Sequence, residues 1–130
     1  MIFVDTNYFL RFLLADVSSQ QKKAKELFQQ GAEGKVRLFT STIVFFELYW
    51  VFTSFYGKSK TQVIKILNDI LSLSFIGIKE RKILETALAQ FEKTSLELED
   101  CYNLVYAQSQ GAKKLATFDQ KLAKKITTKV

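Results

Sequence analysis

The segment Ile2-Phe3-Val4-Asp5-Thr6-Asn7 at the start of the chain sets a pattern on which the whole fold depends. Its apolar residues predict a short buried strand, and the strand ends at an acid followed by polar residues. The same pattern returns near the other end of the chain, where Leu115-Ala116-Thr117-Phe118 precedes Asp119. An aspartate after a strand is commonly a turn former or a helix cap, so neither acid indicates a function by itself.

Between these two segments, apolar runs that predict strands alternate with segments that predict helices. We expect further strands over residues 37–40, 75–78 and 114–117, and one more towards Val130. Capping-box spacing predicts helix starts at Ser18, paired with Gln21, and at Ser59, paired with Gln62. Strands separated by one or two helices pair in parallel. The predicted fold is therefore α/β: a three-layer sandwich around a central, mostly parallel sheet of four or five strands. Because the 130 residues contain no proline and no linker-like tract, we expect a single domain, 1–130.

Glu47 interrupts the most apolar stretch of the chain, Ile43-Val44-Phe45-Phe46-Glu47-Leu48-Tyr49-Trp50-Val51-Phe52. This stretch predicts a helix that is apolar on nearly every side, with Ser41 or Thr42 as its cap. An unpaired carboxylate is costly to bury, so we expect Glu47 to have a compensating partner. The alternatives are a structural ion pair, for which Arg11 is the nearest arginine candidate, and a bound cation, which we favour.

Asp100 completes a set of four scattered acids, which are Asp5, Glu47, Asp100 and Asp119. Asp100 is expected at the start of a helix, where a capping role is the competing explanation. In parallel α/β sheets, ligands bind beyond the carboxyl ends of the strands, which is where Asp5 and Asp119 are predicted to lie. The joint pattern predicts that the fold gathers the four acids into one site.

Composition narrows the chemistry of such a site. The chain has no histidine and a single cysteine, Cys101. This excludes Ser-His-Asp and Cys-His nucleophile systems, an internal disulfide and metal centres built on imidazole or several thiolates. Oxygen ligands remain, and they suit hard cations such as Mg²⁺ or Mn²⁺. A divalent ion held by carboxylates can hydrolyse a phosphodiester bond without any histidine.

The charge of the chain is basic, with a formal net charge of +6. Lysine clusters, such as Lys22, Lys23 and Lys25, could contact the phosphates of a polyanion, although lysines on amphipathic helices commonly serve only solubility. No apolar run approaches the roughly 18 residues that a membrane span requires. The first residues also lack the features of a signal peptide, so we expect a cytoplasmic protein.

Four motifs carry a resemblance to a known family. They are Val4-Asp5-Thr6-Asn7, the glutamate in the helix after the second strand, Glu99-Asp100-Cys101-Tyr102-Asn103-Leu104-Val105-Tyr106-Ala107 and Leu115-Ala116-Thr117-Phe118-Asp119. In order and spacing they resemble the PIN-domain ribonucleases, and the size of the chain is similar to that of the small VapC-type toxins of toxin–antitoxin pairs. Cys101 and Tyr102 depart from the family pattern, because a small residue and an aliphatic residue are commoner there.

The resemblance implies a PIN-like fold and a metal-dependent endoribonuclease. Asp5, Glu47, Asp100 and Asp119 would be catalytic and would bind one or two Mg²⁺ or Mn²⁺ ions. Thr6, Asn7 and Thr117 would be supporting polar groups. The implied partners are an RNA substrate, a second copy of the chain in a homodimer and a cognate VapB-like antitoxin.

Aromatic residues make up 14% of the chain, and several follow Glu47, which suggests an exposed apolar face suited to a dimer partner or an antitoxin.

The alternative function is a non-catalytic PIN-like module that binds RNA or protein, with structural or vestigial acids. The complete set of four acids disfavours that alternative.

Overall fold

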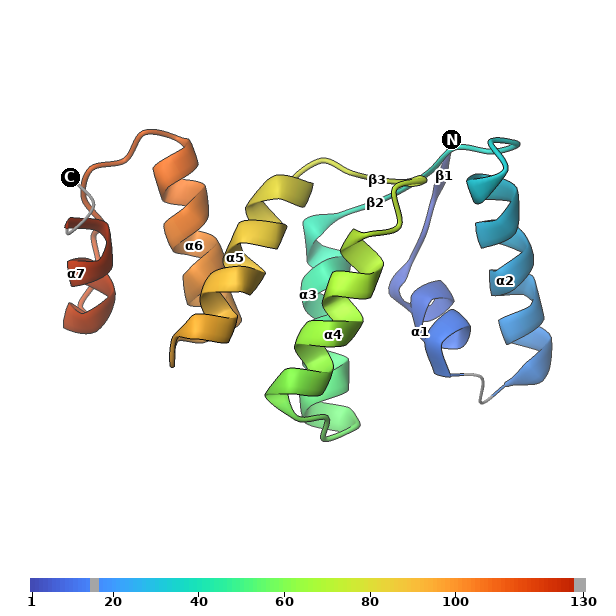
Figure 1. Cartoon of the computed structure of the whole chain (residues 1–130), viewed down its shortest axis with the longest axis horizontal. Coiled ribbons are helices and arrows are strands. Elements are labelled where there is room, and N and C mark those ends of the chain that lie inside the picture. Colours follow the sequence, from blue (N-terminus) through green and yellow to red (C-terminus); the bar gives the residue numbers. More distant parts are fainter. Residues whose placement is uncertain (15–16, 128–130) are drawn as a thin grey trace. The chain divides into compact units, whose positions relative to one another are not determined.

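A computed structural model gives the structure of residues 1–14 and 17–127. The chain folds into two compact units, Met1–Lys79 and Glu80–Val130 (Figure 1). Within the described residues, the first unit contains every strand and the second is helical. The predicted α/β class with a parallel sheet is confirmed, although helices make up most of the structure. None of the described helices combines the length and apolarity needed to cross a membrane.

Among the described residues, the sheet has three strands and not the predicted four or five; their order is β1-β2-β3, and neighbouring strands run parallel. The strands are β1 (Ile2–Phe3), β2 (Leu38–Thr40) and β3 (Ile76–Ile78). In the register of the sheet, Leu38 lies between Ile2 and Ile76. Helices separate consecutive strands in the sequence, so each connection carries the chain back to begin the next strand in the same direction as the last.

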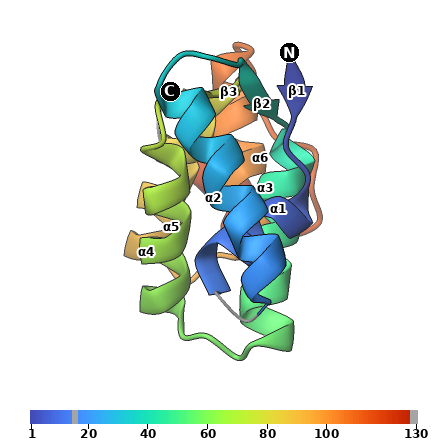
Figure 2. The ribbon, with the colours of Figure 1, turned by 90° about the vertical axis from the view of Figure 1, so that its right-hand side faces the viewer.

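Helices connect these strands. They are α1 (Thr6–Leu14), α2 (Ser18–Ala32), α3 (Thr42–Trp50), the π-helix η1 (Val51–Phe55) and α4 (Lys60–Leu71). Helix α1 packs against both α2 and α3, and α3 packs against α4 (Figures 1 and 2). The predicted helix that carries Glu47 therefore forms, but it continues beyond Trp50 as a π-helix.

One of the two predicted capping boxes forms and the other does not. The Ser59 hydroxyl accepts from the Gln62 backbone N–H, and the Gln62 side chain accepts from the Ser59 backbone N–H, as predicted. At the start of α2, the Gln21 backbone N–H donates instead to the carbonyl of Val17. Val17 is the cap residue, so the predicted cap at Ser18 was wrong by one residue.

Helix α2 lies close to the sheet because Gly31 has no side chain. A Cβ atom at this position would lie 2.6 Å from Leu38 Cδ1 and 3.2 Å from Phe75 Cδ2. One helical turn earlier, the Phe28 ring packs edge-on against Phe9, with 5.4 Å between ring centroids. This contact joins α2 to α1 inside the core of the first unit.

The second unit consists of α5 (Arg81–Lys93), α6 (Leu98–Ser109) and α7 (Gln120–Thr127). Helix α6 packs against α5 and α7. Cys101, one of the departures from the family pattern, is completely buried.

The predicted strand over residues 114–117 was wrong, because these residues form neither strand nor helix. A strand requires a hydrogen-bonded neighbour, and residues 80–127 of this unit offer no other strand to pair with. The strand predicted towards Val130 falls on the end of α7 and on residues 128–130, and the latter lie outside the described residues.

Candidate functional site

Asp5 stands at the boundary between the first strand and the first helix. Val4 is fully buried, and its backbone N–H donates a 2.8 Å hydrogen bond to the carbonyl of Phe39. Asp5 follows with an exposed side chain, and its own carbonyl accepts a hydrogen bond from the backbone N–H of Tyr8. The sheet thus fixes the backbone up to Asp5, while the carboxylate faces away from the core.

Thr40 is a residue that sequence reasoning missed. Its buried hydroxyl donates a 2.8 Å hydrogen bond to the carbonyl oxygen of Val4. Thr40 ends β2 and lies next to Val4 because Phe3 pairs with Phe39 one residue earlier. This bond extends the attachment of β1 to β2 as far as the residue before Asp5. A threonine at the end of a predicted strand is the only signal of it, since the sequence does not reveal the register.

Thr6 and Asn7 begin α1 and differ in their surroundings. Thr6 is only 7% exposed, and its hydroxyl has no hydrogen-bond partner among the described residues. A buried hydroxyl is normally satisfied by the protein, by water or by a ligand. Asn7 is exposed. An unsatisfied oxygen next to Asp5 therefore fits a site that holds an ion or an ordered water.

Glu47 lies in the middle of α3, whose cap is Ser41, one of the two predicted candidates. The Ser41 hydroxyl accepts a 3.2 Å hydrogen bond from the backbone N–H of Val44. Phe46 and Leu48 on either side of Glu47 are buried, whereas Glu47 itself is only partly buried. The carboxylate of Glu47 is therefore less buried than the sequence predicted.

Glu47 also lacks the structural partner that was considered for it. Among the described residues, no ion pair or hydrogen bond involves its carboxylate, and none joins it to Arg11. The ion-pair explanation therefore has no support in the first unit.

Asp100 lies in the first turn of α6 and does not cap it. The helix begins at Leu98, two residues before the predicted start, so the cap position belongs to Glu97. Asp100 is partly buried, and no described residue forms a hydrogen bond with its side chain. The capping explanation for Asp100 is therefore wrong, although the helix dipole still favours a negative charge there.

Tyr102, two residues further along α6, is tied to the start of α5. Its hydroxyl donates a 2.8 Å hydrogen bond to Glu80 Oε1. Burial, together with the hydrogen bond and the negative charge of Glu80, raises the pKa of Tyr102 from 10.0 to about 12. The second departure from the family pattern thus connects two helices of this unit.

Asp119 caps α7 with one of its two carboxylate oxygens. Oδ1 accepts a 3.2 Å hydrogen bond from the backbone N–H of Leu122. The Asp119 backbone N–H donates a 3.1 Å bond to Thr117 Oγ1, so this hydroxyl fixes the turn before the helix. Oδ2 accepts no hydrogen bond from the described residues of this unit. Asp119 is therefore a real cap, and its second oxygen remains available to a ligand.

Each unit carries two of the four acids, on or immediately before helices that pack together. In the first unit, Asp5 precedes α1, and α1 packs against α3, the helix that carries Glu47. In the second unit, Asp100 lies on α6, and α6 packs against α7, the helix that follows Asp119. Within neither unit do three Asp, Glu or Cys side chains of the described residues converge into a metal-binding group. All the candidate ligands are oxygens, and the unsatisfied Thr6 hydroxyl adds another, so the residues present fit a hard divalent cation.

Comparison with known proteins identifies the family of this chain. A model of the PIN domain matches residues 2–126, which is nearly the whole chain. No curated protein and no solved structure matched the chain. PIN domains are generally nucleases, typically use divalent metal ions, and their presence suggests RNA binding. The chain belongs to the PIN domain family.

Proposed function

We propose that this protein is a Mg²⁺- or Mn²⁺-dependent endoribonuclease that hydrolyses phosphodiester bonds of RNA. The observation that carries the proposal is Glu47, a half-buried carboxylate on α3 that has no ion-pair partner among the described residues. In a protein of the PIN domain family, a bound cation accounts for that charge better than any side chain of the first unit.

The proposed ligands are Asp5, Glu47, Asp100 and Asp119. When bound, a divalent ion makes water nucleophilic at neutral pH and offsets the charge that develops on the phosphoryl oxygens. The protein must then hold the carboxylates in place, and the structure supports this for two of them. The bond from Thr40 to Val4 fixes the backbone before Asp5, and Thr117 fixes the turn before Asp119.

The supporting polar groups are Thr6, Asn7 and Thr117. Thr6 has an unsatisfied buried hydroxyl next to Asp5, which suits a hydrogen bond to a water held in the site. Asn7 is exposed one residue further on, where its amide could orient the substrate. Thr117 acts on Asp119 through the backbone.

We further propose that the enzyme is the toxin of a VapBC-type pair in the cytoplasm, that it forms a homodimer, and that a VapB-like antitoxin inhibits it. Its size and its motifs, which resemble those of VapC-type toxins, support this proposal. Exposed aromatic residues after Glu47 also suit a protein partner: Trp50 is 43% exposed and Phe55 79% exposed. Light scattering at micromolar concentration should show a dimer, and a monomer would reject that part of the proposal.

The decisive experiment compares the wild type with Glu47→Gln on a panel of end-labelled RNAs. We expect cleavage with Mn²⁺ or Mg²⁺, none with a chelator, and a loss of at least about 100-fold in Glu47→Gln, since even residues that only support metal ligands contribute 10- to 100-fold. Glu85→Gln is the matched control, because Glu85 is an exposed glutamate on α5. Cleavage that survives chelation, or that Glu47→Gln leaves unchanged, would reject the mechanism. Absence of cleavage by the wild type with either metal would instead favour a non-catalytic binding module.

A further inference from the structure

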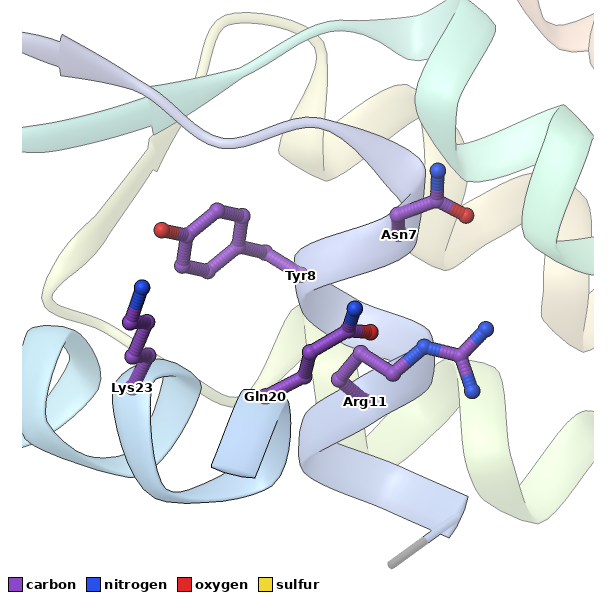
Figure 3. A pocket seen from close by; sticks show the side chains of 5 residues that line it. All are labelled: Asn7, Tyr8, Arg11, Gln20 and Lys23. Carbon is purple, nitrogen blue, oxygen red and sulfur yellow. The ribbon is translucent and has the colours of Figure 1, made fainter. Parts of the chain in front are cut away.

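A pocket of about 450 Å³ lies between α1 and α2 in the first unit (Figure 3). Its described lining consists of Asn7, Tyr8 and Arg11 from α1, and Gln20 and Lys23 from α2. Pockets of roughly 300 to 1,000 Å³ hold small organic ligands. The space is therefore large enough for a single nucleotide.

The chemistry of the pocket favours a phosphate and a base together. Arg11 and Lys23 are cations, and none of the lining residues that the structure describes is an acid. A guanidinium matches the geometry of phosphate oxygens, and a lysine ammonium neutralises their charge. Tyr8 is 40% exposed, so its ring can stack on an unpaired base. Amide groups such as those of Asn7 and Gln20 can donate to and accept from the edge of that base.

The arrangement of the side chains separates these roles. In Figure 3, the Lys23 amine lies near the hydroxyl end of the Tyr8 ring, while the Arg11 guanidinium points to the opposite end of the pocket. Positive charge at both ends, with a ring and amides between them, suits a nucleotide whose neighbouring phosphates continue along a strand.

The pocket begins at Asn7, two residues beyond Asp5. Tyr8 donates its backbone N–H to the carbonyl of Asp5, and Arg11 lies one further turn along α1. A strand whose scissile phosphate lies at Asp5 would therefore reach the pocket with its next nucleotides. An acidic peptide could also meet the two cations, but it would leave the Tyr8 ring without a stacking partner.

We infer that this pocket binds one nucleotide of the single-stranded RNA substrate, adjacent to the cleaved bond. Arg11 and Lys23 hold the flanking phosphates, and the Tyr8 ring stacks on the base. This inference rests on the proposed ribonuclease activity, because it assumes an RNA strand that leads away from Asp5.

The test measures the binding of a fluorescent single-stranded oligoribonucleotide by full-length protein in chelator, where cleavage is prevented. Lys23→Gln should weaken binding and make the slope of log Kd against log salt shallower by about 0.7, the value for one lost phosphate contact on a single strand. Lys25→Gln is the matched control, since Lys25 is exposed on α2 and does not line the pocket. Equal changes in both variants would overturn the inference in favour of general charge attraction.

A second variant tests the stacking role of Tyr8. Tyr8→Leu keeps an apolar side chain but removes the ring, and it should raise Kd about fivefold or more, because stacking contributes about 1–3 kcal/mol per base. The same variant should bind an abasic oligonucleotide as the wild type does. The inference would be contradicted if Tyr8→Leu weakened the binding of both oligonucleotides equally. It would also be contradicted if polyglutamate bound to the pocket as tightly as RNA does. Absence of cleavage by the wild type would instead reject the proposed function, so the two failures are distinguishable.

Discussion

The hydroxyl of Thr40 donates a 2.8 Å hydrogen bond to the carbonyl oxygen of Val4, so a side chain of β2 holds the backbone immediately before Asp5. Thr40 and Val4 are both buried. The carbonyl of Val4 would therefore lose this donor without direct access to water if the hydroxyl were removed.

Thr40→Val should lower the free energy of unfolding by about 1–3 kcal/mol, the usual penalty for leaving a buried polar group unsatisfied. RNA cleavage should fall by about tenfold or more, as for other residues that orient metal ligands. Urea unfolding and cleavage assays measure the two effects. Thr40→Ser keeps the hydroxyl and should recover most of both. If Thr40→Val is as stable and active as the wild type, Thr40 does not position Asp5.

Two substitutions at Asp119 separate its capping role from its proposed catalytic role. Asp119→Asn retains an oxygen for the bond from the Leu122 N–H, so its Tm should stay close to that of the wild type while cleavage is lost. Asp119→Ala removes both the capping oxygen and the proposed metal ligand. It should lose cleavage and also be destabilised by about 1 kcal/mol. Thermal unfolding and cleavage of the two variants are compared side by side. An active Asp119→Asn protein would show that the residue is only a cap.

Metal binding should stabilise the folded protein. Carboxylates gathered without a cation repel one another, and a ligand that binds only the native state raises stability by mass action. With Mn²⁺ at about 100 times its Kd, the expected gain is about 2.7 kcal/mol. Asp5→Asn should reduce this gain, whereas the exposed control Glu85→Gln should retain it. A melting curve that does not respond to Mn²⁺ or Mg²⁺ would count against the site.

The bond between Tyr102 and Glu80 predicts a change in stability at alkaline pH. The folded state holds the Tyr102 proton more tightly than the unfolded state, since folding raises the pKa from 10.0 to about 12. The stabilisation is therefore fully present below pH 10 and is lost as the pH rises from 10 towards 12. Urea unfolding at several pH values should show that the stability difference between wild type and Tyr102→Phe shrinks across this interval. A difference that stays constant would contradict the raised pKa.

The sequence predicted those features of the fold that depend on neighbouring residues. The boundary at Asp5 follows from a short apolar run, and the capping box of Ser59 with Gln62 follows from the preference of each residue for the free N–H groups of a helix. The shift of the cap from Ser18 to Val17 shows the limit of this reasoning, because Val17 has no side-chain oxygen to mark it as a cap and a local pattern does not fix a helix boundary to one residue.

Features that depend on a distant partner could not be predicted in this way. The bond from Thr40 to Val4 requires the register of β1 and β2, which no local pattern encodes. Residues 114–117 have the composition of a strand, but a strand also requires a paired neighbour, and Phe118 at the end of the run is fully exposed. Asp100 appeared to be a cap because acids favour helix starts, while the helix begins two residues earlier.

Gly31 determines how closely the end of α2 approaches the sheet. Its missing side chain lets the helix rest on Leu38, and Lys23 lies on the same helix eight residues earlier, about 12 Å away at 1.5 Å per residue. A methyl group at position 31 would lie 2.6 Å from Leu38 Cδ1, so either the Leu38 side chain or this end of the helix would have to move. If α2 moved as a whole, its opposite end would also shift relative to α1, so Gly31 would influence the width of the proposed nucleotide pocket from a position that does not line it.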